Sequence, residues 1–211
     1  SDHAISGGSS GKTVTINAGS GTLNFRGLLG VDSASNLTAN AGSISFNGAW
    51  GGSTSLGDVS LTSVSGVTLP SITAASGKSV SVVASGSSSD VTVGAGKAIS
   101  SGGAVTLQAG RDVVLGAGAT VASAASGTAV VLVSGRDFVN GSGSGAPISL
   151  SGGGRWLSYS TSPASDTRGG MTSGFVRYGC TYGGSCPAGV SIPGTGNGFI
   201  YTYQPTLTIT P

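Results

Sequence analysis

The chain contains no glutamate and few charged residues of any kind. Only 8% of its 211 residues are charged, as seven Asp and nine Lys or Arg. Amphipathic helices carry charged residues along their exposed face, so this composition argues against a helical domain. The formal net charge of +2 is too small, and the basic residues are too scattered, to form a surface that binds nucleic acid or anionic lipid. We expect neither as a partner.

The chain also lacks long apolar runs and the residues of a typical metal site. No run approaches the roughly 18 apolar residues of a membrane-spanning helix, so we expect no membrane insertion. Zinc takes four ligands, but His3 is the one histidine and lies far from both cysteines. The aspartates show no acidic cluster of the kind that calcium prefers. We therefore expect no metal and no cofactor.

Cysteine is limited to Cys180 and Cys186, close together in a glycine-rich segment. A local disulfide and two free thiols both fit this pair, and we favour the disulfide. A disulfide would indicate an oxidising compartment.

Glycine, by contrast, is abundant, with 40 residues, yet the mean hydropathy is +0.26. Disordered chains combine low hydrophobicity with high net charge, so this chain has enough apolar material to form a core. Small residues together with Val, Leu, Ile and Thr favour β-structure.

An internal repeat organises this material. Residues 104–114, Ala-Val-Thr-Leu-Gln-Ala-Gly-Arg-Asp-Val-Val, recur at 129–139 as Ala-Val-Val-Leu-Val-Ser-Gly-Arg-Asp-Phe-Val. Equivalent positions are separated by 21, 25 and 25 residues, at Val59, Val80, Val105 and Val130. A period in the twenties with short apolar segments is typical of a solenoid, in which each repeat buries the apolar face of its neighbours.

Short segments between residues 12 and 150 alternate apolar, polar and apolar residues, as in Val14-Thr-Ile16 and Val80-Ser-Val82. This period of two directs one face inward and the other outward. We predict an all-β fold, a parallel β-helix over residues 1–150, with about six turns and a length of roughly 30 Å.

Residues 151–211 differ in composition. All five tyrosines, both cysteines and five of the seven prolines lie there. Because a solenoid needs a terminal element to cover its last open turn, we predict a C-terminal aromatic- and proline-rich cap or extension with short strands.

The aromatic residues of this cap are the candidate ligand surface, because exposed Trp and Tyr stack on sugar rings and anchor protein contacts. The candidates are Trp156, Tyr159, Tyr178, Tyr182, Tyr201 and Tyr203. Burial of these rings between the cap and the rod is the alternative.

Two Gly-Arg-Asp turns, at residues 110–112 and 135–137, occupy equivalent places in consecutive repeats. We expect their side chains to form a short ladder on one edge. Such a row either binds an acidic sugar or, in the interpretation we prefer, stabilises the turns by exposed ion pairs. Thr13-Val-Thr15 is similar to the Thr ladders of ice-binding solenoids, but most strands carry one outward Thr or Ser, so we expect solvated strand faces.

Many β-helix proteins degrade polysaccharides, which requires acids and bases that converge on one groove. Here the aspartates are mostly one per repeat, there is no Gly-x-Ser-x-Gly motif, and His3 is the one histidine. We predict no catalytic activity, with a polysaccharide lyase or hydrolase as the alternative.

The Gly-Arg-Asp repeats resemble those of filamentous haemagglutinin-like exoproteins of the two-partner secretion pathway. Residues 154–170, Gly-Arg-Trp-Leu-Ser-Tyr-Ser-Thr-Ser-Pro-Ala-Ser-Asp-Thr-Arg-Gly-Gly, and residues 194–201, Gly-Thr-Gly-Asn-Gly-Phe-Ile-Tyr, resemble the segment that ends the β-helix in large adhesins of this family.

The resemblance implies a right-handed β-helix, a secreted or cell-surface location on a Gram-negative bacterium, and a role in adhesion, aggregation or biofilm formation. It also implies export through an outer-membrane secretion partner and a glycan or protein receptor on a host or bacterial surface. The Asn-rich motifs of the family's secretion domain are not seen, so we expect a monomeric internal or C-terminal section of a longer exoprotein. No binding residue carries over from the family.

Overall fold

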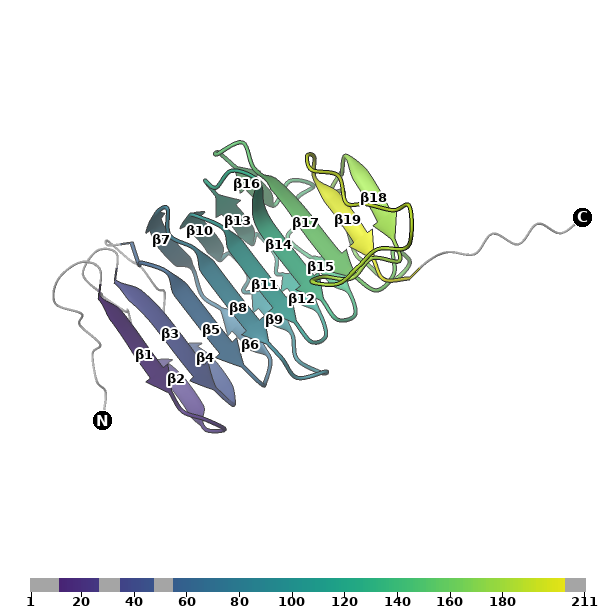
Figure 1. Cartoon of the computed structure of the whole chain (residues 1–211). Coiled ribbons are helices and arrows are strands. Elements are labelled where there is room, and N and C mark those ends of the chain that lie inside the picture. Colours follow the sequence, from purple (N-terminus) through teal and green to yellow (C-terminus); the bar gives the residue numbers. More distant parts are fainter. Residues whose placement is uncertain (1–11, 27–34, 48–54, 204–211) are drawn as a thin grey trace, which may run out of the picture.

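The computed structural model describes residues 12–26, 35–47 and 55–203. These residues form strands and no helix, and the strands stack in parallel as a β-solenoid of about seven turns (Figure 1). The predicted all-β parallel β-helix is therefore confirmed. Several residues used in the sequence predictions lie outside the described residues, namely Asp2, His3 and Asp32.

Three parallel sheets form the sides of the solenoid, and each complete turn adds one strand to each of them, as β8, β9 and β10 do. The first, here the long sheet, has nine strands in the spatial order β1, β3, β5, β8, β11, β14, β17, β19, β18. Their bounds are Thr13–Asn17 (β1), Asn36–Ala41 (β3), Val59–Ser63 (β5), Val80–Ala84 (β8), Val105–Ala109 (β11), Thr128–Ser134 (β14), Arg155–Ser160 (β17), Phe175–Tyr178 (β18) and Gly198–Tyr201 (β19).

The other two sheets have four strands each. The second sheet comprises Val67–Leu69 (β6), Val91–Val93 (β9), Val113–Leu115 (β12) and Phe138–Asn140 (β15). The third sheet comprises Ile72–Ser76 (β7), Ala98–Gly102 (β10), Thr120–Ser123 (β13) and Ile148–Leu150 (β16). A separate parallel pair joins Thr22–Arg26 (β2) and Ser43–Asn47 (β4), and β4 contacts β6.

The register confirms the predicted repeat positions. Val59 pairs with Val80, Val80 with Val105, and Val105 with Val130. These four valines form one apolar column inside the solenoid. The inward side chains two positions further along the strands form a second, made of Leu61, Val82, Leu107 and Leu132, all of them buried. Each such buried side chain contributes about 1.5–3 kcal/mol relative to exposure, and it does so only because the next turn covers it.

Glycine recurs in the Gly-Arg-Asp turns because the stacked backbones leave no room for a Cβ atom. A Cβ atom at Gly135 would lie 2.2 Å from the carbonyl oxygen of Gly110, and one at Gly110 would lie 2.2 Å from that of Gly86. Any larger residue would push neighbouring turns apart, so these glycines set the close stacking at this corner.

Strand β17 continues the long sheet beyond residue 150. Leu132 in β14 pairs with Ser158, and Thr167 forms a bridge to Val139 in the second sheet. Residues on both sides of position 150 therefore share a sheet, and the division into parts 1–150 and 151–211 stays a prediction.

Candidate functional site

The last three strands of the long sheet do not follow sequence order. β19 lies between β17 and β18, so that β18 is the final strand of the sheet (Figure 1). Residues 179–197, here the cap loop, connect β18 to β19. Cys180 of this loop is buried in a small cluster with Leu157 of β17 and Ile200 of β19. The cap loop therefore packs on the outer side of these strands, away from the solenoid core.

Aromatic rings fill the inside of the same strands. Trp156 is 4% exposed and lies edge-on to Phe199, with 5.0 Å between the ring centres. Tyr201 is fully buried and stacks on Tyr178 at 5.7 Å. These rings complete the core at the end of the rod. Trp156 and Tyr201 consequently present no ring face to a ligand, and the half-buried Tyr178 packs inward against them.

A partly buried polar cluster joins these rings to the turn after β17. The phenol oxygen of Tyr201 accepts hydrogen bonds from Nε and Nη2 of Arg168 at 3.0 and 2.6 Å. The carboxylate of Asp166 accepts the backbone N–H of Phe138 and the hydroxyl of Ser160, both at 2.8 Å. Burial raises the pKa of Asp166 and also that of the Tyr201 phenol. Every polar atom named here has a structural partner, so the cluster anchors the terminal turn.

The remaining candidate tyrosines lie on the outside. Tyr159 of β17 packs edge-on against Tyr182 of the cap loop, with 5.3 Å between ring centres, and burial raises the pKa of Tyr159. Tyr182 is 44% exposed and Tyr203 is 52% exposed. Of the six residues nominated from the sequence, Tyr159, Tyr182 and Tyr203 thus retain outward rings.

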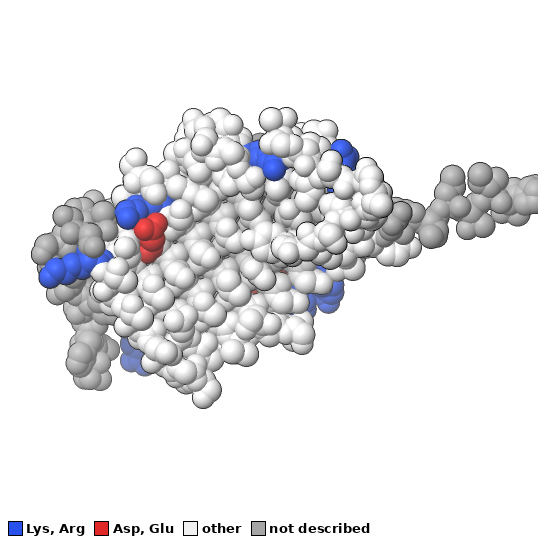
Figure 2. Space-filling view, in the orientation of Figure 1, with Lys and Arg blue, Asp and Glu red and all other residues white. Residues whose placement is uncertain are grey.

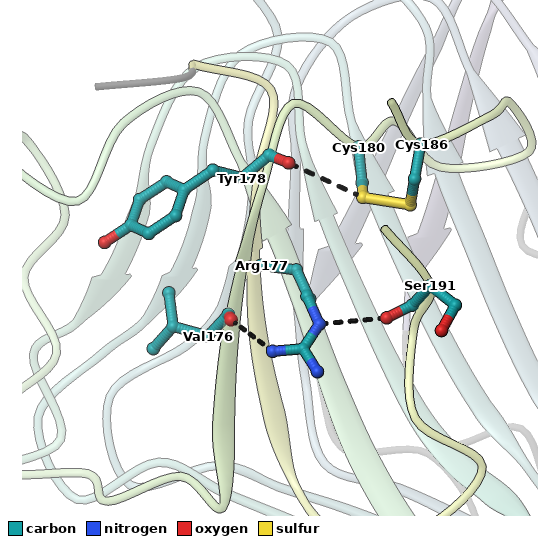
Figure 3. Close-up of a disulfide and its surroundings, with 6 residues drawn as sticks. All are labelled: Val176, Arg177, Tyr178, Cys180, Cys186 and Ser191. Atoms are coloured by element: carbon teal, nitrogen blue, oxygen red, sulfur yellow. Dashed lines mark hydrogen bonds between the residues drawn. A yellow bond between two sulfur atoms is a disulfide. The ribbon is translucent and has the colours of Figure 1, made fainter. Parts of the chain in front are cut away.

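Two cross-links fasten the cap loop. Cys180 and Cys186 form a disulfide, as the sequence analysis favoured (Figure 3). Nε of Arg177 in β18 donates to the carbonyl oxygen of Ser191 at 2.9 Å (Figure 3). A disulfide that closes so short a loop contributes about 2 kcal/mol by restricting the unfolded chain. The loop that carries Tyr182 is therefore restrained in the free protein.

The expected Arg–Asp ladder is present and starts one turn earlier than the Gly-Arg-Asp motif indicates. Arg111 donates Nε to Oδ1 of Asp90 at 2.7 Å and Nη2 to Oδ2 at 2.5 Å. Arg136 binds Asp112 of the preceding turn in the same two-pronged way. Sequence reasoning missed Asp90 because no Gly-Arg precedes it; its signal was its place one period before Asp112.

The same carboxylates also bind the backbone of the next turn. Oδ1 of Asp90 accepts the N–H of Asp112 at 3.1 Å, and Oδ1 of Asp112 accepts that of Asp137 at 3.1 Å. Hydrogen bonds from Arg111 lower the pKa of Asp90. At another corner, the backbone N–H of Ser79 lowers the pKa of Asp58. These acids are committed to holding neighbouring turns together.

The outer side of β1, β3, β5, β8 and β11 is a second candidate surface, here the polar face. One column along it consists of hydroxyl residues in register: Thr15, Thr38, Ser60, Ser81 and Thr106. A parallel column consists of Asn17, Asn40, Thr62, Val83 and Gln108. No residue of either column is charged, and the charged side chains seen in the view of Figure 2 lie around the margins of this face. The strand faces were expected to be solvated. The sequence signal for a polar face is the aligned series Thr-Ile-Asn, Thr-Ala-Asn and Ser-Leu-Thr in β1, β3 and β5.

Two further properties concern only the described part of the chain. It contains no group of three or more His, Cys, Asp or Glu side chains arranged to hold a metal ion. Nor does it contain a helix of the length and apolarity required to cross a membrane. Comparisons of the chain with protein-family models, with curated proteins and with solved structures gave no match.

Proposed function

We propose that this chain is a non-enzymatic section of a bacterial adhesin of the filamentous haemagglutinin-like type. The solenoid acts as a rod, and its surface contacts a glycan or protein receptor on a host or bacterial cell. The full exoprotein is secreted or displayed on the surface of a Gram-negative bacterium with the help of an outer-membrane secretion partner.

The observation that carries the proposal is how the solenoid uses its acidic groups. Asp58, Asp90 and Asp112 each bind a backbone N–H and a cationic side chain of a neighbouring turn. Glycoside cleavage needs two carboxylates placed across one sugar bond and free to exchange protons. Carboxylates that serve as inter-turn links favour a rod over a polysaccharide-degrading enzyme.

The disulfide agrees with the proposed location. Disulfides persist in oxidising compartments such as the cell surface and are rare in the cytosol of most organisms. The Cys180–Cys186 bridge lies in the cap loop, which carries the exposed Tyr182.

Adhesion is tested with the whole chain coupled to fluorescent beads. We expect these beads to attach to epithelial cells or to bacterial cells more than beads that carry albumin, and soluble protein should compete for the attachment. Attachment equal to that of the albumin beads on every cell type would refute the adhesin function.

The enzymatic alternative is tested separately. The protein is incubated with uronate-containing and with neutral polysaccharides, and new reducing ends and unsaturated ends are measured. We expect neither to form. Product formation that disappears in an Asp137→Asn or Asp166→Asn variant, when that variant keeps the circular dichroism spectrum of the wild type, would establish the enzyme alternative instead.

A further inference from the structure

The polar face leads directly to an aromatic pair at the end of one of its columns. Gln108, the last polar residue of the second column, pairs with Val133, and Val133 pairs with Tyr159. Tyr159 in turn packs edge-on against Tyr182. Polar strand residues and an exposed ring from the cap loop therefore lie on the same side of the rod.

We propose that the polar face and the Tyr159–Tyr182 pair form one binding site for a linear, uncharged polysaccharide that lies along the rod, across the strands. This inference rests on the proposed adhesin function and names the chemical class of its receptor.

The hydrogen-bonding groups of the polar face suit a polymer of sugar units. Each hydroxyl of the first column can donate and accept, and each amide in the second column offers both a carbonyl oxygen and an NH₂ group. Sugar hydroxyls need the same combination. Because the strands are stacked in parallel register, these groups repeat about every 4.8 Å along the rod. A ligand with its own linear repeat meets similar groups at successive turns, whereas a compact ligand would contact only one or two turns.

Charge selects the class of polysaccharide. A uronate or sulfated polymer requires cations on its binding surface, and neither column contains one. The cations beside the columns are paired with acids of the rod: Lys78 with Asp58 at 3.1 Å, and Arg111 with Asp90 at 2.5 Å. Arg155, the cation close to Tyr159, has its guanidinium engaged by hydrogen bonds to the hydroxyl of Thr128 and the carbonyl oxygen of Pro193. The face therefore binds neutral chains in preference to acidic ones.

The aromatic pair supplies the apolar contact that polar groups alone lack. Tyrosine rings stack against the C–H face of a sugar, and this contact is stronger when the ring is already held in place. Tyr182 is 44% exposed, so it can contact a sugar, and the Cys180–Cys186 bridge restrains the loop that carries it.

Matched variants test the site. Thr62→Arg places a long cation on the polar face, and Thr68→Arg makes the same change at an exposed outward position of β6 on the second sheet. Tyr182→Ala removes the exposed ring of the pair, and Tyr203→Ala removes an exposed ring outside it. Gln108→Glu adds a negative charge to the face without added bulk, which keeps the test valid if Thr62→Arg fails to fold.

Binding is measured by affinity electrophoresis in gels that contain soluble β-glucan, mannan, galactan, polygalacturonate or alginate. We expect the wild-type chain to be retarded by at least one neutral polymer and not by the two uronates. Thr62→Arg, Gln108→Glu and Tyr182→Ala should each weaken this binding by about tenfold, as expected for residues at the centre of a site, while the two controls should bind like the wild type.

Three results would overturn the inference: no retardation by any neutral polymer, retardation by the uronates alone, or equal binding by Thr62→Arg and Thr68→Arg. If the beads still attach to cells in any of these cases, the adhesin function stands and only the neutral-polysaccharide receptor is wrong. Binding of a neutral polysaccharide without attachment to cells would mean that the polysaccharide site is right and that the adhesin function is wrong.

Discussion

Replacing Phe199 by Ala should uncouple the last turns from the rest of the rod. The Phe199 ring centre lies 5.0 Å from that of Trp156 and 6.3 Å from that of Phe138, and the guanidinium of Arg168 lies 4.5 Å above it. Truncation of a buried Phe costs about 3–5 kcal/mol, because apolar contact is lost and a cavity remains. In a solenoid each turn is stabilised by its neighbours, so the cost falls on the terminal turns.

The assay compares two probes in urea. Trp156 fluorescence reports the terminal turns when it is recorded in a Trp50→Phe background, since the chain has two tryptophans. Far-ultraviolet circular dichroism reports the strands of the whole rod. We expect Phe199→Ala to lower the midpoint of the fluorescence transition well below that of the dichroism transition, and Tyr203→Ala, at an exposed position, to leave both unchanged. A change below about 1 kcal/mol in the fluorescence transition, or equal shifts of both probes, would refute the assigned role of this ring.

Three other predictions concern the rod. Gly135→Ala should destabilise it by about 2–4 kcal/mol, because the new Cβ atom meets the backbone of the preceding turn, whereas Gly194→Ala, with open space around its Cβ position, should be nearly neutral. Ser158→Ala should stabilise the chain by about 1 kcal/mol, because the buried Ser158 hydroxyl has no hydrogen-bond partner; Ser160→Ala, which removes a bonded hydroxyl, should destabilise it. The pKa of Asp90 is lowered, so its carboxylate stabilises the fold above the ordinary Asp range and this stabilisation is lost as the pH falls through the lowered pKa. The deficit of Asp90→Asn in unfolding free energy should therefore be largest near neutral pH and shrink in acid.

Equilibrium urea unfolding measures all three. Equal stability of the Gly135→Ala and Gly194→Ala variants would contradict the close stacking at the corner. A loss of stability in Ser158→Ala would mean that its hydroxyl has a partner, and a deficit of Asp90→Asn that does not change with pH would mean that the ionised carboxylate contributes nothing.

Much of the rod follows from local pattern. The spacing of the aligned valines predicts the register between successive strands of the long sheet, because stacked turns must align apolar side chains to bury them. These residues are Val59, Val80, Val105 and Val130. The Gly-Arg-Asp repeats likewise predict the Arg–Asp ladder, since equivalent residues in successive turns lie one above another. Alternation within a strand also indicates which side chains share a face, but the columns of the polar face depend on the alignment of successive turns.

The cap followed less directly from its composition. Trp156 and Tyr159 lie three positions apart in β17. Because side chains alternate between the two faces of a strand, Trp156 points into the core and Tyr159 points outward. Which of the two faces points inward can be decided only once the strand and its neighbours are known. The position of β19 between β17 and β18 is a long-range choice that no local pattern encodes.

The sequence by itself determined the period, the corner glycines and the identity of the inward residues along the rod, because each depends on contacts between copies of one short pattern. Only the tertiary structure decided which aromatic rings close the core, which remain outside, and that Gln108, Val133 and Tyr159 form one line. These outcomes depend on where the non-repeating cap loop folds back. The Cys180–Cys186 bridge constrains this loop locally, and its position depends on packing against strands distant in sequence.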